Sequence, residues 1–250
     1  MGFFSRPRLS ETPRLPETLV IAGRTVQLVA NRRARSQAIR LRVNPVAGAV
    51  EISLPPRGGL PQALRLLETH QDWLATRIKA FPAPRPLLPG ACLPFDGRDI
   101  CIDWHAGHPR APVLDGDRLQ LGGPVSLVPG RVLRWLKAAA LADMTSATHD
   151  IAAMVGRPVA QVRIGDPRAR WGSCAGSGGP DARIAYSWRL ILAPSHVRRN
   201  VVAHEVAHLV HADHGPGFHA LLARLDPHAG ETRRWLARHG PALHWVGREA

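Results

Sequence analysis

The sequence predicts an α+β protein whose N-terminal half is rich in strands and whose C-terminal half is rich in helices, one of them packed on an antiparallel sheet. Three stretches carry this prediction: residues 20–56 alternate apolar and polar side chains, residues 131–156 have a long helical pattern, and residues 201–215 read VVAHEVAHLVHADHG. The composition agrees, because 45% hydrophobic and 21% charged residues in a chain of 250 are typical of a folded globular protein.

The first elements are strands followed by a helix. Residues 1–18 are polar and contain prolines, which predicts a flexible arm. Turn signals at residues 22–23 and 44–48 divide the alternating stretch into a series of antiparallel strands, whose arginines are expected on the solvent face. Residues 60–81 have apolar residues at roughly helical spacing and predict one amphipathic helix packed on this sheet.

The proline-rich segment of residues 82–90 is the most linker-like part of the chain. Two hairpins are expected after it, the second turning at Asp115-Gly116, and then the helix that Gly156 closes. No repeat with a period of 20 to 50 residues is visible. We therefore expect the arm of residues 1–18, a strand-rich lobe of residues 19–130 with one helix, and a helix-rich lobe of residues 131–250.

Two strands are predicted before the histidine-rich stretch. Residues 159–174 form the first and residues 182–192 the second, and the loop between them is rich in glycine. In the second strand one face would consist of alternate residues, which are Ile184, Tyr186, Trp188 and Leu190. A helix is expected to begin at Pro194-Ser195 and to contain residues 201–215.

Charge and cysteine content limit the function classes. The formal net charge is +14, almost all from arginine, which predicts a solvated basic surface or weak contact with an anionic partner such as nucleic acid. The three cysteines Cys92, Cys101 and Cys174 have irregular spacing and predict a reducing compartment rather than a disulfide framework. There is no apolar run of about 18 residues and no signal-peptide core, so we expect a cytoplasmic protein with no membrane contact.

The pattern His-Glu-x-x-His occupies residues 204–208. Positions four apart on a helix lie one above the other, so the imidazoles of His204 and His208 can reach one Zn²⁺. Glu205 is placed to contact a metal-bound water rather than the metal. Val, Ala and Leu surround these residues, which predicts a buried helix, and a polar stripe in a buried helix requires a compensating cation.

The third ligand is chosen among several residues. His214 is favoured because Asp213, Gly215 and Pro216 should break the helix and turn the chain back toward the metal. His211 is one helical turn further along and would be less able to reach the ion. It is therefore expected to contact the ligands rather than the metal. The other candidates are Glu231, on a later helix, and Cys174, on a strand.

Three motifs in this order, RWGSC, YSWRLILAP and VAHEVAHLVHADHGPGF, resemble those of the YgjP-like metallopeptidase family, relatives of the SprT and Spartan type proteases. The resemblance extends from the strands near residue 32 to Trp235. It implies a zincin-like catalytic lobe in residues 131–250, with both lobes in one family domain. It also implies a zinc metallopeptidase with His204, His208 and His214 as ligands and Glu205 as the catalytic acid/base.

The sequence departs from the family pattern after the third histidine. The family's turn reads Asn-His-Ser-Pro-x-Phe-Trp, whereas residues 213–219 read DHGPGFH, so His219 replaces the tryptophan and the packing behind His214 is a question for the structure.

The resemblance also implies a mechanism. A zinc-bound water would attack the peptide carbonyl while Glu205 takes up its proton. Tyr186, Arg170 and Arg189 are candidate donors to the oxyanion, and an exposed edge of either predicted strand could hold an extended peptide substrate. The alternative is a basic nucleic-acid-associated protein with a structural zinc, or a protease that acts on DNA-bound proteins.

Overall fold

The computed structural model describes residues 15–34, 38–176, 179 and 181–249. Most of the expected N-terminal arm lies outside these residues. The described chain forms two compact units that divide between Phe81 and Pro82, at the start of the proline-rich segment. The expected lobes divide near residue 130 instead, because residues 82–130 look like a continuation of the strand-rich region in the sequence.

The first unit contains a four-stranded sheet and two helices. Its strands are β1 (Thr18–Ile21), β2 (Arg24–Arg32), β3 (Arg40–Asn44) and β4 (Ala49–Leu54), in the order β1-β2-β4-β3. The expected turns at residues 22–23 and 44–48 are present. The outer pairs are antiparallel as predicted, but β2 and β4 are parallel, which differs from a purely antiparallel series. Local alternation marks strands without fixing which of them become neighbours.

Two helices replace the single predicted helix of residues 60–81. They are α1 (Leu60–Thr69) and α2 (Gln71–Lys79), and the backbone leaves helical geometry at His70, with φ −106° and ψ 22°. A straight helix of this length would extend about 30 Å, whereas the six-residue strand β4 extends about 20 Å. The break lets both short helices remain over the small sheet.

The second unit begins with another four-stranded sheet. It consists of β5 (Cys92–Phe95), β6 (Arg98–Trp104), β7 (Val113–Asp115) and β8 (Arg118–Leu121), and β5-β6 and β7-β8 are the two expected hairpins. Buried residues of these strands share a hydrophobic core with Val132 and Leu136 of α3 (Val128–Met154), which follows the short 3₁₀ helix Val125–Leu127. This shared core is why the sheet belongs to the second unit.

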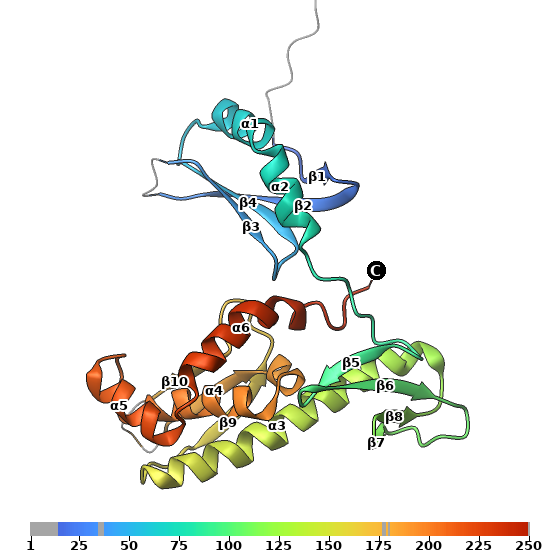
Figure 1. Ribbon diagram of the computed structural model, residues 1–250, viewed down its shortest axis with the longest axis vertical. Helices are drawn as coiled ribbons and strands as arrows, with labels where there is room; N and C mark the ends of the chain where they lie inside the picture. The colour runs from blue at the N-terminus through green and yellow to red at the C-terminus, as the bar shows by residue number, and fades with distance from the viewer. Residues whose placement is uncertain (1–14, 35–37, 177–178, 180, 250) are drawn as a thin grey trace, which may run out of the picture. The chain divides into compact units, whose positions relative to one another are not determined.

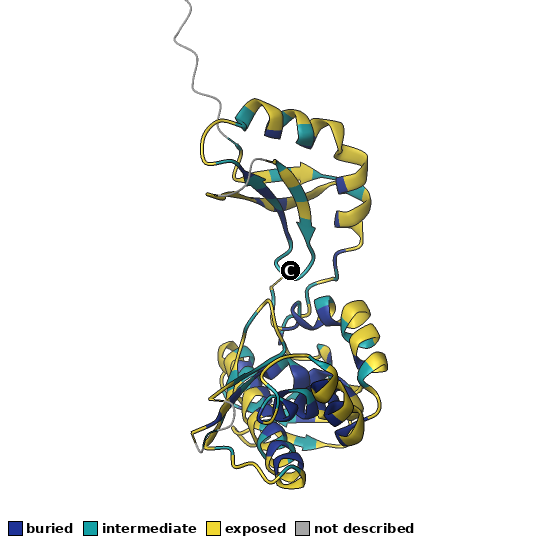
Figure 2. Cartoon of the chain, turned by 90° about the vertical axis from the view of Figure 1, so that its left-hand side faces the viewer, coloured by how far each residue is buried: buried dark blue, intermediate teal, exposed yellow. Residues whose placement is uncertain are grey.

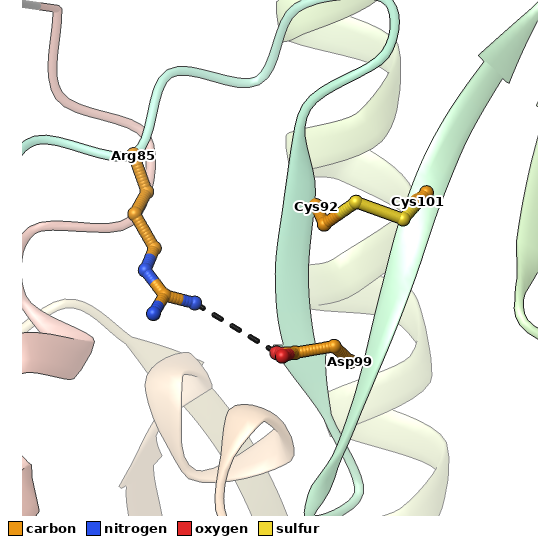
Figure 3. Close-up of a disulfide and its surroundings, with 4 residues drawn as sticks. All are labelled: Arg85, Cys92, Asp99 and Cys101. Carbon is orange, nitrogen blue, oxygen red and sulfur yellow. Dashed lines mark ion pairs between the residues drawn. A yellow bond between two sulfur atoms is a disulfide. The ribbon is translucent and has the colours of Figure 1, made fainter.

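A disulfide joins Cys92 and Cys101, which lie opposite each other on β5 and β6. Figure 3 shows it beside the ion pair of Arg85 and Asp99, whose charged atoms are 3.8 Å apart. The expectation that the cysteines form no disulfide was therefore wrong, and the cysteine content no longer indicates a reducing compartment. Cysteine spacing alone does not show which residues face each other across a hairpin.

The two four-stranded sheets have the same topology. The order β5-β6-β8-β7 repeats β1-β2-β4-β3, and the inner pair is parallel in both. The first hairpins, TLVIAGRTVQL and CLPFDGRDICI, both turn on two residues with positive φ, Ala22-Gly23 and Asp96-Gly97. The repeat was not visible in the sequence because only this hairpin keeps a similar pattern.

A three-stranded sheet supports the histidine-rich helix. It consists of β9 (Gln161–Gly165), β10 (Gly172–Ala175) and β11 (Arg183–Ser187), in the order β10-β11-β9. Residues 159–174 thus form two strands rather than one, because Asp166-Pro167, directly after β9, interrupt the ladder. The β10-β11 pair is antiparallel and the β11-β9 pair is parallel. Residues 188–192 form the 3₁₀ helix η2 instead of continuing the strand.

The remaining helices are α4 (Ser195–Ala207), α5 (Pro216–Leu225) and α6 (Ala229–Leu243), as Figure 1 shows. The long helix α3 contacts α4, η2 and β9, and Figure 2 shows the buried residues gathered in the helices of this unit. The structure confirms the predicted α+β class. Among the described residues, none of the helices has both the length and the hydrophobicity needed to cross a bilayer.

Candidate metal centre

The helix α4 carries His204 and Glu205 and is enclosed by other elements. It contacts α3, α5, α6 and β10, and its buried residues include the apolar series from Val197 to Ala207. The predicted buried helix is thus confirmed. A helix packed on several sides has little freedom to rotate, so the directions of its polar side chains are fixed.

A buried arginine anchors the first turns of α4. The guanidinium of Arg198 donates hydrogen bonds to the carboxylate of Asp96 at 2.8 Å, to that of Asp143 at 3.0 Å and to the carbonyl of Ala193 at 2.6 Å. Asp143 lies on α3, and Asp96 lies in the turn of the disulfide-linked hairpin. These bonds therefore connect the metal-site helix to both neighbouring elements.

Three imidazoles meet at the end of α4. His204, His208 and His214 each offer a ring nitrogen, and these nitrogens all lie within 4.8 Å of one another. The Nε2 atoms of His204 and His214 are 3.2 Å apart. Two nitrogens bound to one tetrahedral zinc at about 2.05 Å would be separated by about 3.3 Å. The His204–His214 pair therefore has the spacing of two zinc ligands, and a ring nitrogen of His208 lies within 4.8 Å of both.

The backbone carbonyl of His211 orients His208. The helix ends at Ala207, earlier than expected, with His208 as its C-cap, and the chain turns so that the carbonyl oxygen of His211 accepts a hydrogen bond from Nδ1 of His208 at 2.9 Å. Protonated Nδ1 leaves Nε2 with the lone pair that a metal requires. His211 thus contributes its backbone carbonyl to the site, rather than its ring as the sequence suggests.

Phe218 provides the packing behind the three histidines. Its ring is 1% exposed, and its centroid lies 5.0 Å from that of His204, 4.6 Å from that of His208 and 4.7 Å from that of His214. His219, which replaces the family's tryptophan, is exposed on the surface of α5. Phe218 therefore supplies the packing behind His214 although His219 stands in place of the tryptophan.

Burial sets the charge of His204. Desolvation, together with the nearby charges of His208, His214 and Arg233, lowers the pKa of His204 to about 4. The imidazole is consequently neutral at pH 7. A neutral ring nitrogen is the form that binds a metal ion.

Glu205 is buried against the strand β10. Its side chain is 6% exposed, and a Cβ atom added to Gly172 of β10 would lie 2.5 Å from Oε1 and 2.8 Å from Cδ of Glu205. Burial raises the pKa of Glu205 to about 7, with Arg170 acting in the opposite direction. A carboxyl group with such a pKa can hold or release a proton near neutral pH.

Glu231 and Cys174, the other candidates for the third ligand, lie outside the group of three histidines. Within the described part of the chain, only His204, His208 and His214 form a group that could hold a metal. Glu231 is exposed on α6 and contacts His228 at 3.3 Å, and Cys174 lies on β10 outside the group.

The three candidate oxyanion donors differ in their exposure and in their hydrogen-bond partners. The hydroxyl of Tyr186 is buried and hydrogen-bonded to Thr148 at 2.9 Å, and Arg189 is bound to Asp166 and to the carbonyls of Leu243 and Val246. Of these three residues, Arg170 is exposed and its charge lowers the pKa of Glu205.

Comparison with protein families gives one match. The family model described as YgjP-like, metallopeptidase domain, matches residues 37–239. Comparison with curated proteins and with solved structures gives no match.

Proposed function

The chain belongs to the YgjP-like metallopeptidase family, and on this premise we propose that it is a zinc-dependent peptidase in which His204, His208 and His214 bind the metal and Glu205 is the catalytic acid/base. The observation that carries the proposal is the convergence of three imidazole nitrogens within 4.8 Å, next to a buried carboxylate. Imidazoles in a tetrahedral arrangement are typical zinc ligands.

The donor set favours a catalytic site over a structural one. Structural zinc sites are closed by four protein ligands, whereas catalytic sites use three and leave one position open. The described residues provide three. A bound zinc ion would supply Lewis acidity, which makes water more acidic and polarises a carbonyl group.

The protein's own residues perform the proton transfers in this proposal. Glu205 accepts the proton of the attacking water on its carboxylate and then donates it to the leaving amine. The His211 carbonyl keeps His208 in one tautomer, and Phe218 restricts the rings to one arrangement. Arg170 is the remaining candidate for contact with the developing negative charge.

The strand β10 is a candidate binding edge for the substrate. Among the described residues, its only strand partner is β11, and a Cβ added to its first residue, Gly172, would lie 2.5 Å from Oε1 of Glu205. An extended peptide that pairs with the edge opposite β11 would pass close to the carboxylate, and main-chain hydrogen bonds would hold it with little side-chain selectivity.

Two substitutions test the function. Glu205→Gln should retain zinc and abolish peptide hydrolysis, whereas the same change at the exposed Glu231 should alter neither. His204→Ala should lower the zinc content of the purified protein, with His196→Ala on the same helix as the control. If Glu205→Gln hydrolyses a peptide at the wild-type rate, the catalytic role is refuted.

A protease that acts on DNA-bound proteins is the second candidate. The first 81 residues contain thirteen Lys and Arg against five Asp and Glu, and the arginines of β2 and β3 are exposed. Each phosphate contact releases counterions, so retention on DNA should fall steeply as salt increases. If the protein is not retained on DNA at low salt, its positive charge does not serve DNA binding and this second candidate is refuted.

A further inference from the structure

The RWGSC motif places a glycine where the candidate catalytic carboxylate meets the sheet. Gly172 is the first residue of β10, and a Cβ added there would lie 2.5 Å from Oε1, 2.7 Å from Cγ and 2.8 Å from Cδ of Glu205. Real Cβ contacts are longer than 3.0 Å. Any side chain at position 172 would therefore have to displace Glu205 or the strand.

Backbone strain does not explain this glycine. Gly172 is absent from the glycines with positive φ, and it pairs with Tyr186 in a regular antiparallel register. An alanine is compatible with such a backbone. The requirement for glycine at this position arises from the contact with Glu205.

The strand is held too firmly to move away from Glu205. The carbonyl of Trp171 accepts a hydrogen bond from the backbone N–H of Ser187 at 2.8 Å. On the other side the Trp171 indole packs against α6, where a Cβ on Gly240 would lie 2.8 Å from its Cζ2 atom. Trp171 is thus enclosed between β11 and α6, so the side chain of Glu205 would move first.

The residue opposite Gly172 closes the same space. Directly paired residues of an antiparallel sheet project to the same face, and Tyr186 is 1% exposed, with its hydroxyl bound to the buried Thr148 at 2.9 Å. Tyr186 is thus fixed by its own hydrogen bond. The Glu205 carboxylate therefore packs against the backbone of Gly172 and the ring of Tyr186.

We propose that Gly172 is a positioning residue, which sets the carboxylate of Glu205 against β10 and thereby aligns it with the three histidines and with a peptide bound along the strand edge. The role in hydrolysis rests on the proposed function, whereas the contact itself does not.

The test is a double-mutant cycle on the metal-free protein. Gly172→Ala should lower the urea midpoint when Glu205 is present and should leave it unchanged in a Glu205→Ala background, because the clashing atoms are then absent. Gly165→Ala in β9 is the matched control, since its added Cβ meets its nearest atom, Cδ of Pro167, at 3.7 Å. Equal destabilisation by Gly172→Ala in both backgrounds would overturn the inference, as would failure of both Gly172→Ala proteins to fold.

The second measurement is kinetic. Displacement of the carboxylate by about 1 Å should lower kcat about 100-fold with little effect on KM, and zinc content should remain at the wild-type level because the three atoms nearest an added Cβ at Gly172 all belong to Glu205. A kcat within threefold of wild type would refute the positioning role. If the wild-type protein shows no peptidase activity, the proposed function fails, and the urea cycle still decides whether Gly172 holds Glu205.

Discussion

Removal of the Cys92–Cys101 disulfide should destabilise the second unit. The bond closes a loop with a sequence separation of nine residues, and it connects the hairpin whose turn residue Asp96 binds Arg198 of the metal-site helix. Loop-closure entropy predicts that the bond contributes about 2.6 kcal/mol to the free energy of unfolding. With a urea dependence of about 2 kcal/mol per molar, the unfolding midpoint should fall by about 1.3 M on reduction.

The assay compares oxidised protein, reduced protein and the double variant Cys92→Ser/Cys101→Ser by urea unfolding monitored by circular dichroism. The reduced protein and the double variant should have the same lower midpoint, and Cys174→Ser should remain sensitive to reductant. Thiol titration of oxidised protein in denaturant should detect one thiol, from Cys174. A count of three thiols, or a midpoint that does not change on reduction, would refute the reasoning.

Three further predictions concern single side chains. Phe218→Ala should lower the free energy of unfolding by about 3–5 kcal/mol, because a ring that contacts all three imidazoles is lost. The same change should weaken zinc binding in a chelator competition. Phe218→Leu should lower the free energy of unfolding by less than half as much. Tyr186→Phe should lower stability by about 1 kcal/mol through loss of the bond to Thr148 and leave kcat unchanged, because the phenylalanine ring fills the same buried place beside Glu205; a large fall in kcat would restore Tyr186 as an oxyanion donor. Burial opposes the charge of Asp166, but its hydrogen bonds and attraction to Arg189 outweigh burial and hold its pKa below the usual value. Its contribution to stability is therefore present above about pH 4 and lost as the pH falls through the lowered pKa, and acid titration of Asp166→Asn should show a smaller loss over that range.

The local pattern of the sequence was sufficient for the site's main elements. The spacing of His204 and His208 required a helix with both rings on one face, and the apolar residues around them required burial, as the structure has it. Asp213, Gly215 and Pro216 favoured a turn that brings His214 back, and its ring nitrogen does lie beside that of His204. These predictions succeed because each depends on residues close together in the chain.

The elements that the sequence did not predict depend on distant residues. Tyr186, Arg170 and Arg189 were all candidate oxyanion donors from the sequence, but Arg189 is bound to the C-terminal segment and Tyr186 to Thr148 of α3. A glycine within a strand pattern indicates a close approach of some group. Only the fold identifies that group as Glu205.

The identity and spacing of the histidines and the glutamate restrict which ion and which proton transfers suit them, and these features can be read from the sequence alone. The fold was needed for the pairing of Cys92 with Cys101, the parallel inner strands, the packing of Phe218 on the histidines and the close approach of Gly172 to Glu205. The physical reason is that helical periodicity is a local property of the backbone, whereas strand pairing and side-chain packing are selected by the free energy of the whole chain.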